Sequence, residues 1–136
     1  MTICIYGTQT EQREIAAAAQ QLPVSAYRRI RCDGFADYDS FIAGMRCGAP
    51  DMVVVMADGA EGMEGVMAAK SLRPGVPVIW LSDDRGFGAQ SYRLGCTFFH
   101  SKPVPPETLS LAMERCIDQM RAVSSEVSSE VSSKEN

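Results

Sequence analysis

Five short apolar segments alternate along this chain with five segments of helical character, and this alternation limits the possible folds more than any other feature. Strands that alternate with helices favour βαβ crossovers, which produce a parallel sheet with helices on both faces. We therefore expect one α/β domain in three layers. The predicted strands cover residues 2–6, 25–32, 52–57, 76–81 and 97–100.

Capping signals mark where two of the helices begin. Thr8 and Glu11 have the spacing of a capping box, in which a hydroxyl and a carboxylate satisfy two free amides at a helix start. Asp37 is the predicted N-cap of the second helix, and Gly48 its stop. The remaining helices are predicted over 64–72, over 87–94 and from 105 onward, with residues 58–62 as a glycine-rich loop.

Composition excludes several classes of protein. The 136 residues suit one domain, and a hydrophobic content of 46% is enough to bury a core. The longest apolar runs are strand-sized, so neither a membrane span nor a secretory signal is expected. A net charge of −4 argues against direct nucleic-acid binding. The five cysteines are odd in number and never spaced as CxxC, which favours free thiols in a cytoplasmic protein.

The last fourteen residues differ from the rest. Residues 1–122 form the predicted domain, whereas 123–136 repeat Val-Ser-Ser-Glu with a period of four. A solvated linker or disordered end is the favoured interpretation, because serine is only a middling helix former. The alternative is a helical extension of the last helix that carries a dimer seam.

Several segments resemble a response-regulator receiver domain. Residues 95–104, GCTFFHSKPV, resemble its end, where a glycine leads into a strand closed by Lys-Pro. Residues 77–82 resemble its fourth strand, and 87–95 resemble the short fourth helix of the LytTR-type subfamily. The resemblance covers about residues 2–121. It implies a flavodoxin-like (βα)₅ fold, an α/β three-layer sandwich with a five-stranded parallel sheet in the order 2-1-3-4-5.

The resemblance also implies a phosphorylation switch. In that family a histidine kinase's phosphoryl group passes to an aspartate after the third strand, and two acidic residues after the first strand hold Mg²⁺. Four residues match family positions that respond to the phosphate. Ser82 matches the hydroxyl residue after the fourth strand, and Phe99 matches the aromatic residue that couples the site to the output face. Lys102 matches the lysine after the fifth strand, and Pro103 matches the proline that follows it.

The half of the switch that would receive phosphate departs from the family pattern. Tyr6-Gly7-Thr8 stands where the acidic pair is expected, so no Mg²⁺ or other cofactor is predicted. Met56 or Ala57 falls at the phosphoacceptor position. Asp58 is the nearest carboxylate and the candidate phosphoacceptor, but the favoured interpretation is that Asp58 and Gly59 form a turn.

Lys102 has two further interpretations. It could bind a small anion or nucleotide together with Ser82, near the amides at the start of the first helix. Alternatively it is a vestigial lysine paired with Asp58 or Asp83, and a pair with Asp58 would fix the loop in one state.

Three arginines, Arg28, Arg29 and Arg31, lie on the predicted second strand, which is an edge strand. Charge on an edge strand discourages unwanted pairing with other strands, or it contacts an acidic partner.

We therefore predict an atypical receiver, or pseudo-receiver, that is not an enzyme and acts by protein–protein interaction. The alternatives are a phosphorylatable receiver that uses Asp58 and a sensor of small anions or nucleotides. The partner is a second copy or another protein, with a histidine kinase as a candidate. The predicted contact face lies on the fourth helix, fifth strand and fifth helix and contains Gln90, Tyr92, Arg93, Phe99, Arg115 and Gln119.

Overall fold

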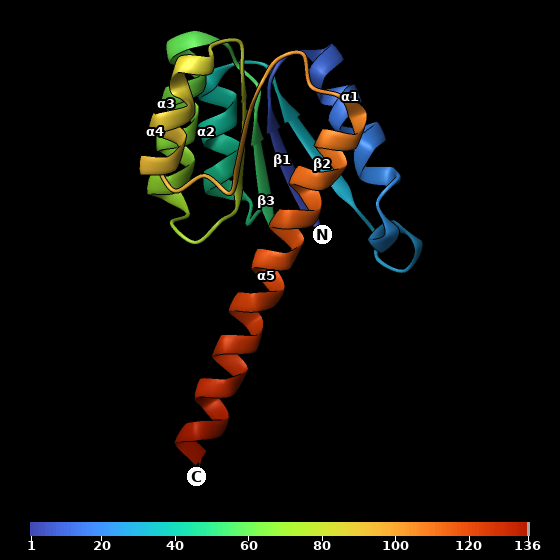
Figure 1. Cartoon of the computed structure of the whole chain (residues 1–136), viewed down its shortest axis with the longest axis vertical. Helices are drawn as coiled ribbons and strands as arrows, with labels where there is room; N and C mark the ends of the chain where they lie inside the picture. Colours follow the sequence, from blue (N-terminus) through green and yellow to red (C-terminus); the bar gives the residue numbers. More distant parts are fainter. Residues whose placement is uncertain (136) are drawn as a thin grey trace.

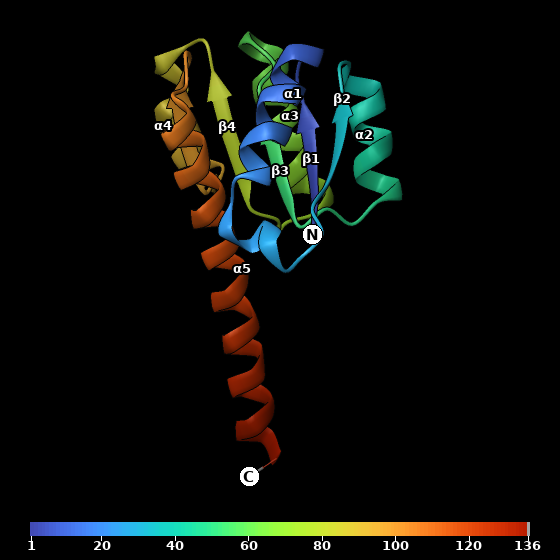
Figure 2. The same ribbon diagram turned by 90° about the vertical axis from the view of Figure 1, so that its right-hand side faces the viewer.

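A five-stranded parallel sheet with helices on both faces forms the molecule (Figures 1 and 2). The computed structural model describes the backbone of residues 1–135 and the side chains of residues 1–122. The strand order is β2-β1-β3-β4-β5, which confirms the predicted flavodoxin-like fold and its topology. The elements are β1 (Thr2–Tyr6), α1 (Gln9–Gln20), η1 (Pro23–Ala26), β2 (Arg31–Phe35), α2 (Tyr38–Cys47), β3 (Met52–Val55), α3 (Gly59–Leu72), β4 (Val78–Ser82), η2 (Arg85–Phe87), α4 (Gly88–Arg93), β5 (Phe98–Ser101) and α5 (Pro106–Glu135).

The core lies on both faces of the sheet, because side chains of a strand alternate between its faces. Ile3, Ile5 and Leu81 belong to the cluster packed against α1 and α5. Tyr6 and Trp80 belong to the cluster on the other face, against α2 and α3. The three central strands are buried on both faces, which is why their sequences are almost continuously apolar.

The second strand lies further along the chain than predicted. Residues 23–26 form a short 3₁₀ helix, and β2 begins only at Arg31. Arg28 and Arg29 therefore precede the strand, and their predicted placement on it is wrong. The residues of β2, Arg-Cys-Asp-Gly-Phe, have little intrinsic strand preference, but parallel pairing with β1 from Thr2 to Tyr6 imposes the extended conformation.

The third helix is longer than predicted. It begins at Gly59 instead of residue 64, so the glycine-rich segment is helical and not a loop. A side chain at Gly62 would overlap the Ala57 carbonyl oxygen, and one at Gly65 would lie 2.8 Å from the Tyr6 ring. These glycines allow α3 to pack closely on the sheet, and that packing outweighs their low helix propensity.

The last helix continues beyond the domain. Its first part packs against the sheet through Leu109, Met113 and Cys116. Its backbone then runs clear of the other elements as far as Glu135 (Figures 1 and 2). The domain boundary at residue 122 and the dimer seam in the tail stay predictions. Within the described residues, no helix is long and apolar enough to cross a membrane.

Candidate functional site

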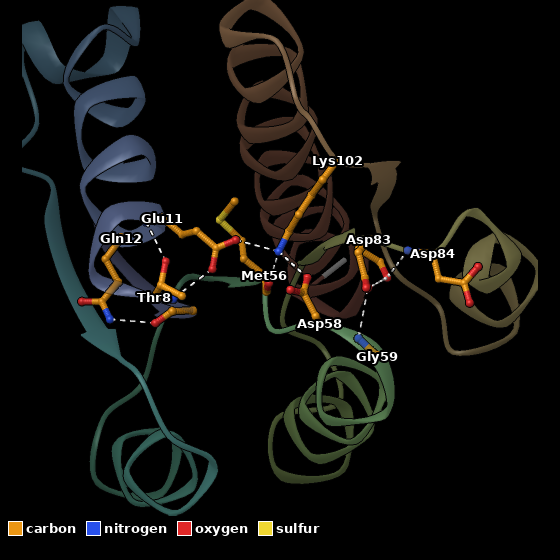
Figure 3. A network of polar contacts seen from close by, with 11 residues as sticks. Thr8, Glu11, Gln12, Met56, Asp58, Gly59, Asp83, Asp84 and Lys102 are labelled. Atoms are coloured by element: carbon orange, nitrogen blue, oxygen red, sulfur yellow. Dashed lines mark hydrogen bonds and ion pairs between the residues drawn. The ribbon is translucent and has the colours of Figure 1, made fainter.

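The lysine that follows β5 is the centre of a polar network at the carboxyl ends of the strands (Figure 3). The ammonium of Lys102 lies 2.6 Å from Glu11 Oε2 and 2.7 Å from Asp58 Oδ1, and it donates a further hydrogen bond to the Met56 carbonyl oxygen. The Lys102 and Glu11 side chains are 20% and 17% exposed, whereas that of Asp58 is 63% exposed. One contact is therefore largely shielded from solvent and the other largely open to it.

Glu11 reaches Lys102 because of its place in the first turn of α1. Its Oε1 accepts a hydrogen bond from the Thr8 amide at 2.9 Å, and the Glu11 amide donates to Thr8 Oγ1 at 3.2 Å. This reciprocal capping box confirms the sequence prediction. It fixes the Glu11 carboxylate at the edge of the sheet, which leaves Oε2 for Lys102. We did not predict this second contact, although the capping-box spacing already placed Glu11 at this edge.

Asp58 does not make the local turn bond that we expected. It occupies the N-cap position of α3, but its side chain makes no capping hydrogen bond and pairs with Lys102 instead. The Gly59 amide instead donates a hydrogen bond to Asp83 Oδ1 at 3.1 Å. Of the two carboxylates considered as partners of Lys102, Asp58 therefore forms the pair, while Asp83 anchors the start of α3.

Met56 is one of the two residues, with Ala57, that the family resemblance puts at the phosphoacceptor position. Its amide donates to the Tyr6 carbonyl, so it continues the line of β3, and its residue surface is 3% exposed. The side chain packs in the apolar cluster between the sheet, α1 and α5. This position therefore presents a backbone carbonyl oxygen to Lys102 and buries a thioether, and neither is a phosphoryl acceptor.

The hydroxyl of Ser82 is engaged in the loop after β4. Ser82 Oγ accepts a hydrogen bond from the Asp84 amide at 3.1 Å and lies 3.5 Å from Asp83 Oδ1. The residue is fully buried. Its carbonyl oxygen accepts from the Lys102 amide at 2.8 Å, so the two residues are joined through the backbone of adjacent strands. The Lys102–Pro103 peptide bond is cis.

Charge in the site is dominated by the two ion pairs. Burial opposes the charged form of Lys102, but the carboxylates of Asp58 and Glu11 outweigh this effect and raise the pKa of Lys102 above its usual value. The ammonium lies between the two carboxylates, where the Mg²⁺ of a receiver would need open oxygen ligands. The described residues contain no group of three or more His, Cys, Asp or Glu side chains that could hold a metal ion, and the two carboxylates of this site are paired with Lys102.

On the predicted contact face, one aromatic side chain is exposed to solvent, whereas several others contact neighbouring residues of the domain. Tyr92 on α4 is 88% exposed. Phe99 is half-buried and packs edge-on against Trp80, with ring centroids 5.5 Å apart. The Arg115 guanidinium lies over the Phe98 ring at 5.2 Å, and Gln119 accepts a hydrogen bond from the Thr97 hydroxyl. Gln90 and Arg93 complete this face on α4.

His100 has a structural environment. Its Nδ1 lies 2.6 Å from the Ser101 carbonyl oxygen, and its ring is stacked on Phe98. No nucleophile or carboxylate contacts it among the described residues.

Comparison with solved structures identifies the fold as that of receiver domains. A receiver domain protein from Clostridium thermocellum superposes with a TM-score of 0.73 at 17% identity, covering 90% of this chain and 98% of its own. A CheY-like receiver from Methanospirillum hungatei gives 0.68 at 21% identity, covering 89% and 97%. A putative CpaE2 pilus assembly protein from Sinorhizobium meliloti gives 0.67 at 21% identity, covering 85% and 99%. No protein-family model and no curated protein sequence matches the chain.

Proposed function

We propose that this domain is an atypical receiver of two-component-type signalling that binds a protein partner without accepting a phosphoryl group. The observation that carries the proposal is the position of the Lys102 ammonium, 2.6 Å from Glu11 and 2.7 Å from Asp58. The lysine that would neutralise a phosphoryl group is already neutralised by the protein's own carboxylates. The proposal is supported further by Met56, which with Ala57 is one of the two residues at the phosphoacceptor position.

The ion pairs explain how a single state of the switch is kept. In a phosphorylated receiver, new negative charge attracts the lysine and the hydroxyl after the fourth strand. Here Glu11 and Asp58 supply that charge permanently, and the Ser82 hydroxyl is bonded to the Asp84 amide. A loop fixed by such contacts has one arrangement instead of two. The domain then presents one surface to its partner at all times.

The surface that we propose for the partner is the face of α4, β5 and α5. Tyr92 is its most exposed large apolar side chain. Arg93 on α4 and Arg115 on α5 belong to the same face. Tyrosine and arginine are enriched among residues that dominate binding energy at protein interfaces. A histidine kinase remains one candidate partner, and a second copy of the chain is another.

A phosphorylatable receiver that uses Asp58 is the second candidate function. The exposed carboxylate of Asp58 beside Lys102 is the observation in its favour. An Asp58 oxygen would attack the phosphorus of a donor such as acetyl phosphate, and acetate would leave. Lys102 would have to turn from Glu11 toward the new phosphate, and Glu11, which also accepts the Thr8 amide, would be the carboxylate left to hold Mg²⁺. These requirements make the first proposal the better supported.

A sensor for a small anion or nucleotide at Lys102 and Ser82 is less well supported. An anion would compete with two carboxylates for Lys102, and the Ser82 hydroxyl is bonded elsewhere. A thermal-shift screen of anions and nucleotides tests this alternative. A ligand that stabilises the wild type and not Lys102→Ala would support it.

Intact-mass spectrometry after incubation with acetyl phosphate and Mg²⁺ tests the main proposal. A receiver that is known to accept phosphate from this donor serves as the positive control. The proposal predicts no adduct on the wild type under conditions that modify the control. A phosphoryl adduct that is lost in Asp58→Asn would overturn it in favour of the second candidate.

A further inference from the structure

The C-terminal part of α5 is a helix whose backbone runs clear of the other elements of the domain. Both views show the backbone beyond Arg121 running away from the sheet and its covering helices (Figures 1 and 2). Residues 123–136 contain three valines and three glutamates against a single lysine. An isolated helix of this length is marginal in water, so its stability requires packing against another surface. A surface suited to it would be apolar and basic.

Such a surface lies where α5 leaves the domain. A groove of about 1140 Å³ opens at the amino ends of the strands, the edge of the sheet opposite Lys102. Residues before β1, β3 and β4 form its walls together with the segment between η1 and β2 and the α5 turn at 117–121. Its apolar lining includes Val24, Leu72, Ile117 and Met120.

Three arginines make this groove basic in a chain of net charge −4. Arg73 donates to the Gly48 carbonyl at 2.6 Å, and Arg121 donates to the Tyr27 hydroxyl at 3.3 Å. Neither contact neutralises a guanidinium, and Arg28 beside them is exposed. Asp51 is the single acidic residue in the lining, and its carboxylate accepts the Thr2 amide at 2.7 Å. The groove therefore favours an occupant that is both acidic and apolar.

We propose that this occupant is the C-terminal tail of a second copy of the chain. The composition of residues 123–135 meets both requirements: valine at every fourth position, and glutamates at 126, 130 and 135. The chain's own tail cannot enter the groove while α5 stays helical, because α5 lines the groove with Met120 and Arg121 and then continues away from it. A tail from another molecule has no such restriction.

The length of the tail fits a two-fold symmetric pair. The helix from residue 122 to 135 has fourteen residues, and at a rise of 1.5 Å per residue it is about 21 Å long. Two such helices placed antiparallel, with the two domains closer together than this length, carry the end of each tail past the start of the other and onto its partner's groove. The glutamates of each tail then lie beside its partner's Arg28 and Arg121. The contact is the same on both molecules, as a closed dimer requires.

Charge reversal in the full-length chain tests this arrangement. One variant carries Glu126→Lys, Glu130→Lys and Glu135→Lys in the tail, and the other carries Arg28→Glu and Arg121→Glu in the groove. Sedimentation velocity over a range of concentrations should show a dimer for the wild type and a dissociation constant raised by about tenfold or more for each variant alone. An equimolar mixture of the two variants should recover the dimer, because both contacts of the heterodimer then join opposite charges.

Three results would overturn the proposal. The first is a wild type that stays monomeric at every concentration, and the second is a dimer that neither reversal weakens. The third is a loss of dimer on tail reversal but not on groove reversal, which would leave only a contact between tails. Arg13→Glu on α1, an exposed arginine outside both the groove and the α4–β5–α5 face, is the matched charge-reversal control and should leave the dimer unchanged. A dimer that Tyr92→Ala weakens and the groove variant does not would instead place the interface on the α4–β5–α5 face.

Discussion

The two ion pairs of Lys102 should contribute very different amounts to stability, although their lengths are nearly equal. The pairs measure 2.6 Å to Glu11 and 2.7 Å to Asp58. Double-mutant cycles with Lys102→Met, Glu11→Gln and Asp58→Asn separate the two. Each replacement keeps the approximate size of the side chain. Glutamine at position 11 can still accept the Thr8 amide, so the capping box is preserved and the cycle reports the ion pair.

Exposure sets the expected magnitudes. Breaking a buried pair costs about 3–5 kcal/mol, whereas exposed pairs contribute about 0.2–1 kcal/mol. Lys102 and Glu11 each keep about a fifth of their side-chain exposure, so we expect a coupling energy of about 2 kcal/mol for that pair. Asp58 is 63% exposed, so we expect about 0.5 kcal/mol for its pair with Lys102. Glu11 should therefore couple about four times as strongly as Asp58.

Urea denaturation followed by tryptophan fluorescence measures both couplings. Trp80 is the only tryptophan and is fully buried, so its emission reports exposure of the core. The free energy of unfolding of the wild type, the three single variants and the two double variants completes both cycles. A coupling of Lys102 to Asp58 equal to or larger than that to Glu11 would refute the reasoning from burial, and with it the role of Glu11 as the inner partner.

Two further predictions concern packing and pH. Gly62→Ala should lower the free energy of unfolding by about 1–3 kcal/mol, because the added methyl group overlaps the Ala57 carbonyl oxygen. Gly75→Ala, where a methyl group meets nothing within 4 Å, should leave stability nearly unchanged in the same urea assay, and equal losses would contradict the packing argument. Stability should also fall as the pH rises above 9, because burial raises the pKa of both Cys4 and Cys116 from 9.0 to about 12, and the unfolded chain then loses thiol protons that the folded chain keeps. Thermal melts between pH 8 and 11 should show a smaller fall in melting temperature for the double variant Cys4→Ala/Cys116→Ala than for the wild type. Equal falls for both proteins would refute the assignment of the pH dependence to these two thiols.

The order of elements could be predicted from sequence, but not the boundary of every element. The central strands are apolar on both faces and therefore visible as continuous runs. The second strand was misplaced because Tyr27 and Ile30 favour a strand, whereas Asp33 and Gly34 in the real strand do not. Pairing with β1 decides its position, and pairing is a tertiary effect that a single segment does not reveal.

The helix start at Gly59 was missed for a related reason. Glycine usually indicates a loop, and the segment 58–62 contains two glycines. In the fold, Gly62 and Gly65 provide the close approach of α3 to Ala57 and Tyr6. That requirement depends on which strands lie beneath the helix, so it follows from the assembled sheet and not from the local sequence.

The site was predicted in part. The resemblance to receivers pointed to Lys102, and counting along the third strand pointed to Met56 and Asp58. The sequence predicts only a capping role for Glu11, because the acidic pair of receivers would stand directly after the first strand and Glu11 lies further along the chain. The first turn of α1 brings its carboxylate back to that same edge of the sheet. A capping glutamate at the edge where a parallel sheet gathers its ligands is the signal that could have identified it.

The most direct test of a switch held by its own carboxylates is a pair of amide ¹H–¹⁵N correlation spectra, with and without acetyl phosphate and Mg²⁺. The amides to follow are those of Asp58, Ser82, Phe99 and Lys102, which surround the ion pairs and connect them to the α4–β5–α5 face. Our account predicts that their chemical shifts stay unchanged when the phosphodonor and Mg²⁺ are added. Shifts of the Phe99 and Lys102 amides that are absent in Asp58→Asn would contradict it, because they would mean that phosphate enters the site and moves the switch.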